Sequence, residues 1–269
     1  MRKAKNERMD AGFILTDETD FTTTEAYKTI RTNIMFSIPK TEQGKVILVT
    51  SSAPNEGKTT TSINLAITFA QTGAKVLLMD CDLRKARVHK YLGLERVDGV
   101  SNVLCGFTEL DQAIKYGVRE NMDCLTAGAI PPNPAELMES EEFKILLSTL
   151  QERYDYIFID TPPVAVVTDA VITMKYCTGV IVVVRENMSM YDALDDTMER
   201  IKKSGTKILG VIMVDCDERI GRYSYYRRGR YGYKYKYRYG YRYGYKYRYH
   251  YHYGDEVENK ESKENKKKK

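Results

Sequence analysis

The stretch KVILVTSSAPNEGKTTT, residues 45–61, constrains the fold more than any other part of the chain. Its apolar residues Val46 to Thr50 predict a buried strand, and the small and polar residues after them predict a tight turn. Apolar residues then recur at the spacing of a helix that packs one face against a sheet, at Ile63, Ala66, Ile67 and Ala70. A strand, a tight turn and a helix in this order bind the phosphates of a nucleotide.

The turn ends in Gly57-Lys58-Thr59, which carries the groups that a nucleotide triphosphate needs. Backbone N–H groups and the positive end of the helix surround the β-phosphate, Lys58 brings a charge to the β- and γ-phosphates, and the Thr59 hydroxyl can ligate Mg²⁺. The usual first glycine is Ser52, and Asn55 stands where a glycine is common, but asparagine accepts a left-handed backbone. The predicted nucleotide-binding residues are Pro54, Asn55, Glu56, Gly57, Lys58, Thr59 and Thr60.

Two aspartates follow the next predicted strand, Lys75 to Met79. Asp80 and Asp82 stand just past the carboxyl end of a parallel strand, which is where open α/β sheets bind ligands. The pair favours a role in handling Mg²⁺ or a reacting proton. Either aspartate alone is equally well explained as the cap of the helix that follows.

A third strand, Tyr156 to Ile159, is followed directly by Asp160. An apolar run closed by an aspartate is the second half of a nucleotide site, in which the aspartate orients Mg²⁺, usually through water. The predicted catalytic residues are Lys58, Asp80, Asp82 and Asp160, and the predicted metal ligands are Thr59, Asp82 and Asp160.

The order of these elements predicts the fold class. Two further strands, Val180 to Val184 and Ile208 to Val214, are separated by segments of helix length. We therefore predict an α/β fold of the P-loop type, with a doubly wound, mostly parallel sheet flanked by helices. Residues 99–106 and 128–138 are predicted loop-to-helix junctions, the second leading into a helix from about Pro134.

The N-terminal part of the chain is polar. Residues 1–20 are predicted to be extended or only locally ordered. One of Thr22, Thr23 and Thr24 is then expected to cap a helix from about Glu25 to Ser37, which Pro39 closes.

The composition supports one α/β domain with an appendage. The chain has 269 residues, of which 42% are hydrophobic. Its five cysteines are scattered without a CxxC pair, which argues against a zinc site or a disulfide framework and favours a reducing cytoplasm. The apolar runs are far shorter than the roughly 20 residues that cross a bilayer, so any membrane association is expected to come through a partner.

The composition changes abruptly at about Gly221. Of the 22 tyrosines, 15 lie between Tyr223 and Tyr253. The segment from Arg222 to Tyr253 also contains ten Lys/Arg and no acidic residue. The net charge of +5 therefore hides a domain that is close to neutral or slightly acidic. Because the segment has no aliphatic residues to build a core, we predict a folded domain over residues 1–221 and a disordered tail over residues 222–269.

Three interpretations of this tail compete. Strict alternation could form a strand with a tyrosine face and a basic face. Interleaved aromatic and basic residues also suit single-stranded nucleic acid. We favour a third interpretation, in which the tyrosines are substrates of the phosphate site on the same chain, and expect no nucleic-acid partner. The predicted phosphorylation sites are Tyr231, Tyr233, Tyr235, Tyr237, Tyr239, Tyr241, Tyr243, Tyr245, Tyr247, Tyr249, Tyr251 and Tyr253.

Several stretches occur together in this chain: EAYKTIRTNIMF (25–36), TSSAPNEGKTTTSINLA (50–66), LLMDCDLRKARVH (77–89), GVSNVLCG (99–106), PPNPAEL (131–137), YIFIDTPPV (156–164) with Asp169 following, and the terminal tyrosines. They resemble the bacterial tyrosine kinases that regulate capsular and extracellular polysaccharide synthesis, in the free cytoplasmic form of Gram-positive bacteria. The resemblance covers nearly the whole chain. It implies ATP and Mg²⁺ as cofactors and autophosphorylation of the tail in trans, with Asp80 or Asp82 as the base that takes the phenol proton.

The resemblance also implies partners. The family's Glu-x-x-Arg-x-x-Arg stripe, which resembles an oligomer contact in ring-shaped octamers, is matched here by Glu25, Lys28 and Arg31. Lys28 departs from the usual arginine and lacks its planar, two-point hydrogen-bonding group. Val214 stands where relatives often carry an asparagine near the adenine. A transmembrane activator and a cognate tyrosine phosphatase are implied as further partners, so the protein is expected in the cytoplasm, at the membrane through the activator.

Two rival functions share the fold. Partition and cell-division ATPases carry an extra lysine early in the phosphate loop, where this chain has Ala53, and they lack tyrosine tails. A nucleic-acid-binding ATPase would be marked by strongly salt-dependent binding through the tail.

Overall fold

A seven-stranded sheet forms the centre of the protein, in the order β3-β4-β2-β5-β1-β6-β7. The computed structural model of the chain describes residues 13–39 and 43–216. Within them β3 runs antiparallel to β4, and each other neighbouring pair of strands is parallel. The strands are β1 Lys45–Ser51, β2 Val76–Asp80, β3 Lys115–Arg119, β4 Met122–Leu125, β5 Tyr156–Asp160, β6 Gly179–Arg185 and β7 Ile208–Val214.

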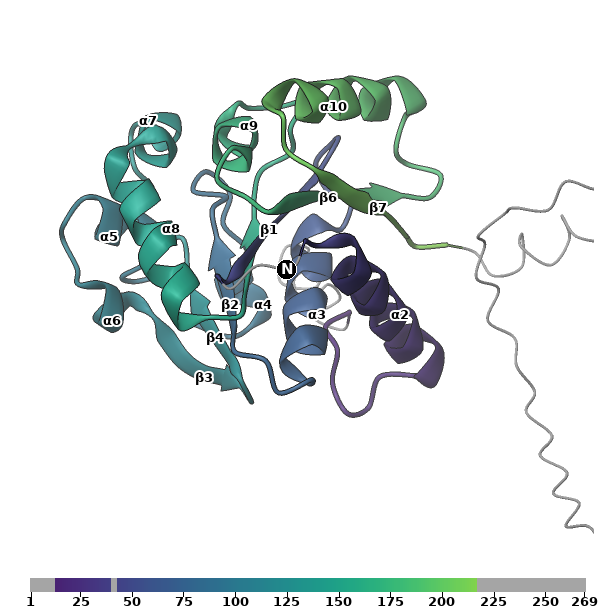
Figure 1. Cartoon of the computed structure of the whole chain (residues 1–269), viewed down its shortest axis with the longest axis horizontal. Helices are drawn as coiled ribbons and strands as arrows, with labels where there is room; N and C mark the ends of the chain where they lie inside the picture. The colour runs from purple at the N-terminus through teal and green to yellow at the C-terminus, as the bar shows by residue number, and fades with distance from the viewer. Residues whose placement is uncertain (1–12, 40–42, 217–269) are drawn as a thin grey trace, which may run out of the picture. The chain divides into compact units, whose positions relative to one another are not determined.

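Helices cover both faces of the sheet (Figure 1). One face packs against α2, α3 and α4, and the other against α5 and α7 to α10, because the side chains of each buried strand alternate between the two apolar layers. The helices are α2 Phe21–Ser37, α3 Lys58–Ala70, α4 Val88–Tyr91, α5 Val100–Leu104, α6 Leu110–Ala113, α7 Pro134–Glu139, α8 Glu141–Arg153, α9 Asp169–Met174 and α10 Tyr191–Ser204.

The sheet order creates a crevice at the carboxyl ends of β1 and β5. These neighbouring strands lead to helices on opposite faces, since α3 follows β1 and α9 follows β5. In open α/β sheets, ligands bind where the connections diverge in this way. The predicted doubly wound, mostly parallel sheet is confirmed, and the five predicted strands are β1, β2, β5, β6 and β7.

The antiparallel pair β3–β4 was not among the predicted strands. Its residues 115–125 mix charged, glycine and apolar residues without alternation, and β3 has no buried residue. The two predicted loop-to-helix junctions lead into α5 and into α7, which begins at Pro134. No helix of the described ranges is long and apolar enough to cross a membrane.

The predicted cap and start of the N-terminal helix were wrong, whereas the described residues before it, 13–20, form only turns and irregular structure, as expected. Asp20, and not a threonine, caps α2: its carboxylate accepts a hydrogen bond of 2.9 Å from the Thr23 N–H, so the helix begins earlier, at Phe21. Two of the residues before it, Ile14 and Leu15, are buried in the core beside α3. Residues 1–12 and the predicted tail lie outside the described residues.

The buried side chain of Asn64 on α3 holds this N-terminal segment. Its Oδ1 accepts a bond of 2.8 Å from the Leu15 N–H, and its Nδ2 donates to the Phe13 carbonyl at 2.9 Å. Asn64→Ala leaves both backbone groups without these partners, so we expect the free energy of unfolding to fall by about 1–3 kcal/mol. Urea denaturation measures this fall. Asn33→Ala, on the exposed side of α2, is the matched control and should change it by less than about 0.5 kcal/mol; equal effects of the two changes would contradict the assignment.

Candidate active site

The phosphate loop between β1 and α3 has the backbone of an anion-binding turn. Asn55 and Gly57 both adopt left-handed conformations, with φ of 66° and 89°. Turns that alternate right- and left-handed residues point successive N–H groups into one concavity. A side chain at Gly57 would be crowded as well as strained, because its Cβ would lie 3.2 Å from Cγ2 of Val214. The unusual asparagine is therefore compatible with a phosphate cradle.

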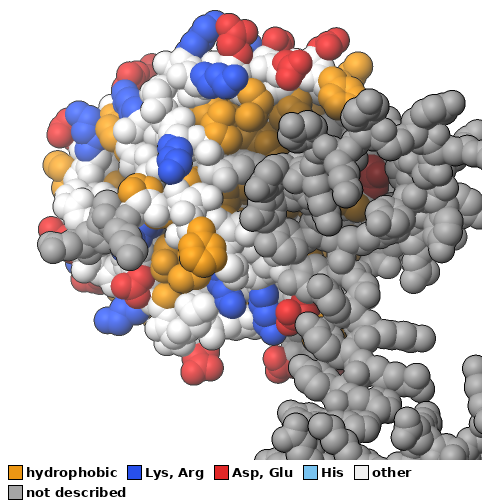
Figure 2. Space-filling view, turned by 45° about the vertical axis from the view of Figure 1, so that its right-hand side comes forward, with side chains coloured by type: hydrophobic (Ala, Val, Ile, Leu, Met, Phe, Trp, Pro, Cys, Tyr) orange, Lys and Arg blue, Asp and Glu red, His pale blue; other side chains and the backbone are white. Residues whose placement is uncertain are grey.

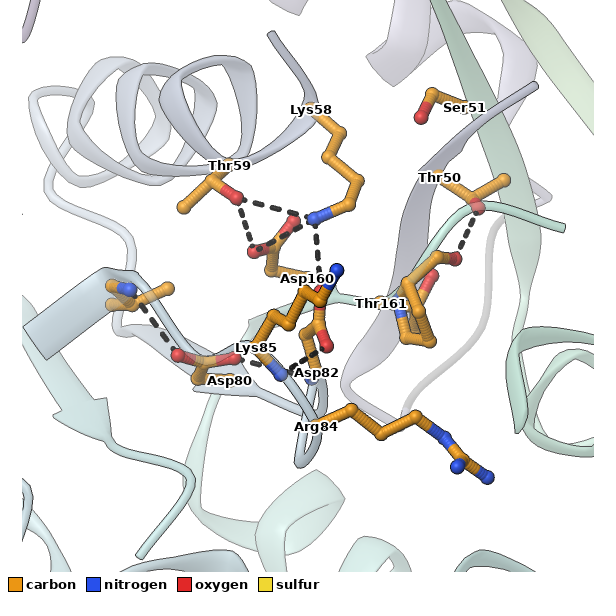
Figure 3. A network of polar contacts seen from close by, with 12 residues as sticks. Thr50, Ser51, Lys58, Thr59, Asp80, Asp82, Arg84, Lys85, Asp160 and Thr161 are labelled. Carbon is orange, nitrogen blue, oxygen red and sulfur yellow. Dashed lines mark hydrogen bonds and ion pairs between the residues drawn. The ribbon is translucent and has the colours of Figure 1, made fainter. Parts of the chain in front are cut away.

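Lys58 lies between two of the predicted aspartates (Figure 3). Its Nζ donates to Asp82 Oδ2 at 3.2 Å and lies 4.0 Å from Asp160 Oδ2. Residues from three segments of the sequence thus meet at the carboxyl ends of β1, β2 and β5. The strand register brings them together, since Asp160 is paired with Val49 on one side and with Asp80 on the other.

Asp160 is further held by the first turn of α3. The Thr59 hydroxyl donates to its Oδ2 at 2.7 Å, and the Ser62 hydroxyl donates to its Oδ1 at 3.2 Å. Ser62 was not predicted as a site residue. Its position three residues after Thr59, nearly one helical turn along the same face, is the only sequence signal that could have indicated it.

Asp80 has the surroundings of a structural cap. It is fully buried, and its carboxylate oxygens accept hydrogen bonds from the backbone N–H groups of Asp82 at 3.1 Å and Val88 at 3.2 Å. This is the capping interpretation that the sequence left open. Asp82 makes both a structural contact and a contact in the site. Its Oδ1 accepts a hydrogen bond from the Lys85 N–H at 2.9 Å, while its Oδ2 contacts Lys58.

The crowding of charge in this buried site shifts the pKa values of its members. Burial, with added repulsion from Asp160 and Asp82, raises the pKa of Asp80 to about 8. Burial also raises the pKa of Asp160, although Lys58 and Thr59 oppose it. For Lys58, burial favours the neutral amine, but attraction to the three carboxylates outweighs it and raises the pKa.

The residues present fit a magnesium ion that binds together with a nucleotide. Mg²⁺ is usually held by one or two carboxylates, water and substrate phosphates. Thr59, Asp82 and Asp160 offer one hydroxyl and two carboxylates next to the phosphate loop. Over residues 13–39 and 43–216, no group of three or more His, Cys, Asp or Glu side chains could hold a metal ion alone. Phosphate oxygens and water would therefore complete its coordination.

Arg84 and the residues of the predicted α2 stripe make contacts within the chain. Arg84, which precedes α4, makes a two-point contact with the buried Asp169, with its Nε at 2.8 Å and Nη2 at 3.2 Å from the carboxylate oxygens. In the α2 stripe, Lys28 pairs with Glu25 at 2.9 Å, and Arg31 donates to the Thr68 carbonyl of α3 at 2.7 Å.

Fold and site together define a nucleotide-binding P-loop domain, and comparisons with known proteins give its family. The model of the AAA domain family matches residues 44–217. Tyrosine-protein kinase YwqD of Bacillus subtilis is 38% identical over 86% of this chain and 96% of its own length. Tyrosine-protein kinase wzc of Salmonella typhimurium is 36% identical over 75% of this chain, which spans only 28% of wzc.

The solved structures agree with the relatives in sequence. The crystal structure of the chimerical protein CapA2B2 superposes with a TM-score of 0.70, at 37% identity, over 73% of this chain and 86% of that one. The chain belongs to the bacterial tyrosine-protein kinases, within the AAA domain family. It is therefore a kinase whose P-loop binds ATP, as the resemblance implied.

Proposed function

We propose that this kinase transfers the γ-phosphoryl group of ATP to tyrosines 231–253 of another copy of itself, with Mg²⁺ as cofactor, and that it thereby regulates capsular or extracellular polysaccharide synthesis. The observation that carries the proposal is the meeting of Lys58, Asp82 and Asp160 beside the phosphate loop. Lys58 neutralises charge on the transferred group, and Thr59 and Asp160 hold the cation. Most of the rate enhancement in phosphoryl transfer comes from such positioning and neutralisation.

The contacts of the two candidate bases favour different roles for them. Asp82 is better placed to take part in the reaction, because its Oδ2 accepts a hydrogen bond from Lys58 Nζ in the site. Asp80 accepts two backbone hydrogen bonds and is fully buried. We therefore propose Asp82 as the group that accepts the phenol proton, after Lys58 has left it to bind the nucleotide phosphates. We propose Asp80 as a residue that positions the Asp82 backbone.

Charge supports the tail as a substrate. Residues 13–39 and 43–216 contain 20 Lys/Arg and 27 Asp/Glu, a net charge of −7, whereas Arg222 to Tyr253 carries ten basic residues and no acidic one. Opposite charge attracts the unmodified tail to the domain. Each phosphate adds about −1.5 to −2 charges, so about six would cancel the ten cations and weaken docking.

The proposed partners would meet an apolar surface next to the stripe. The exposed large hydrophobic residues include Phe21, Met35 and Phe36 on α2 and Val211 and Met213 on β7. In the view of Figure 2, one group of hydrophobic side chains lies in the upper part of the surface, below charged side chains, and smaller groups lie lower down. We propose that neighbouring copies contact the α2 surface in a ring, and that a transmembrane activator recruits the kinase to the membrane. A cognate phosphatase would reverse the reaction.

The test of transfer in trans uses two variants in one mixture. Full-length Lys58→Met provides the tail, and wild type truncated after residue 221 provides the active site. With Mg-ATP, we expect phosphate on tyrosines of the Lys58→Met chain in the mixture and none when that variant is incubated alone. Intact and peptide masses measure this. Hydrolysis of ATP without phosphorylated tyrosine, even with the activator's cytoplasmic segment added, would favour an ATPase switch instead.

A further inference from the structure

The side chain of Glu56 does not face the predicted phosphate position. It lies in the middle of the phosphate loop and is fully buried. Its carboxylate accepts hydrogen bonds from the Ser52 hydroxyl at 2.9 Å, from the Ala53 N–H at 2.8 Å and from the Ser189 hydroxyl. Ser52 and Ala53 belong to the same loop, but Ser189 comes from the turn between β6 and α10.

Ser189 is itself held in place by that turn. Its hydroxyl oxygen accepts a hydrogen bond of 2.8 Å from the Arg185 N–H, and its own N–H donates to the Arg185 carbonyl at 3.0 Å. Arg185 ends β6, which pairs in parallel with β1, the strand that leads into the phosphate loop. The Ser189 hydroxyl is therefore fixed relative to the sheet and is already oriented toward Glu56.

A carboxylate in a phosphate-binding loop has to point away from the nucleotide, since like charges repel. Glu56 stands between the left-handed residues Asn55 and Gly57. The same few backbone dihedral angles therefore set where the Glu56 side chain points and where the N–H groups of the loop point. Three hydrogen-bond donors hold the carboxylate on the protein side of the loop. They thereby favour the backbone conformation in which the N–H groups face the phosphates.

We propose that Ser189 is a positioning residue of the nucleotide site: through Glu56 it holds the phosphate loop in the shape that binds nucleotide. This role goes beyond tail phosphorylation, because it concerns nucleotide affinity alone. Ser189 contacts no reacting atom, and it lies 133 positions from Glu56 in the sequence.

The test measures binding of a fluorescent ADP analogue in the presence of Mg²⁺, together with KM for ATP and kcat for tail phosphorylation. Ser189→Ala is expected to weaken binding of the analogue and to raise KM by about tenfold, because a hydrogen bond to a charged group is lost. We expect kcat to stay within about twofold, since binding is lost equally in the ground and transition states. Ser189→Thr, which keeps a hydroxyl, should restore most of the affinity.

Ser204→Ala provides the matched control. Its hydroxyl also makes local hydrogen bonds, donating to the Ile201 carbonyl at 2.7 Å, but it lies at the far end of α10. A change there should leave analogue binding unaltered. Glu56→Gln is the second variant, and the double variant Glu56→Gln/Ser189→Ala should bind little worse than Glu56→Gln alone, because both changes act on one contact.

Three results would overturn the proposal: wild-type affinity in Ser189→Ala, an equal loss in Ser204→Ala, or fully additive losses in the double variant. Failure of tail phosphorylation leaves the binding measurement intact, so an error in the proposed function and an error in this assignment can be told apart.

Discussion

Lys58→Met is expected to reduce tyrosine phosphorylation by about 10³-fold, the scale of loss when a charge-stabilising donor is removed from an active site. The Lys58 side chain is 11% exposed and lies between Asp82 and Asp160, with Nζ 3.2 Å and 4.0 Å from their carboxylate oxygens. Methionine keeps the length and apolar stem of the lysine but cannot neutralise the transferred phosphoryl group. Initial rates with radiolabelled ATP and the isolated tail as acceptor measure the loss.

Lys45→Met is the control for this prediction. Lys45 begins β1, the same strand that ends at the phosphate loop, so it lies at the opposite edge of the sheet. Its ammonium group lies over the ring of Tyr156, 6.0 Å from the ring centre, and not in the site. Activity within about twofold of wild type is expected. Retention of more than about a tenth of the activity by Lys58→Met would contradict the assigned role.

Asp80 should make the nucleotide-free protein less stable as the pH rises from 5 to 8. The carboxyl titrates near 3.8 in the unfolded chain and at about 8 in the folded protein, because burial and the neighbouring carboxylates disfavour its charge. Between these values the folded state binds a proton that the unfolded state does not. The free energy of unfolding therefore falls with rising pH across this window. Asp80→Asn removes this contribution, on the order of a few kcal/mol.

Urea denaturation at pH 5 and pH 8, in EDTA and without nucleotide, tests this. The fall in stability of wild type between the two pH values should exceed that of Asp80→Asn, while Asp192→Asn, an exposed aspartate of α10, should behave as wild type. An equal fall in Asp80→Asn and wild type would show that the proton is held elsewhere.

The fold and much of the site could be predicted because their signals are local. A buried apolar run, a turn ending in Gly57 and a helix with apolar residues on one face dictate the strand, loop and helix at residues 45–70. Asp80 and Asp160, which end β2 and β5, had to lie close together, since parallel neighbouring strands end at the same edge of the sheet. The role of each site residue, by contrast, stays a prediction.

Sequence reasoning missed four features, and two of them depend on contacts between distant residues. The bond from Ser189 to Glu56 spans 133 positions, and the bond from Leu15 to Asn64 spans 49, so neither leaves a periodic pattern. The start of α2 was misplaced because Asp20 competed with three adjacent threonines for the cap, and only the geometry shows which oxygen reaches a free N–H. β3 was missed because an exposed edge strand lacks the apolar run that marks a buried one.

The bond from Arg31 to the Thr68 carbonyl has a mechanical consequence. Thr68 lies in the last turn of α3 and Lys58 begins that helix, so about 15 Å of regular helix connects the α2 contact to the phosphate loop. A guanidinium has five N–H donors, and this bond uses one. Under the proposed ring contact, a second copy would bind other donors of Arg31 without breaking its bond to Thr68, and assembly would then restrain the end of α3 opposite Lys58.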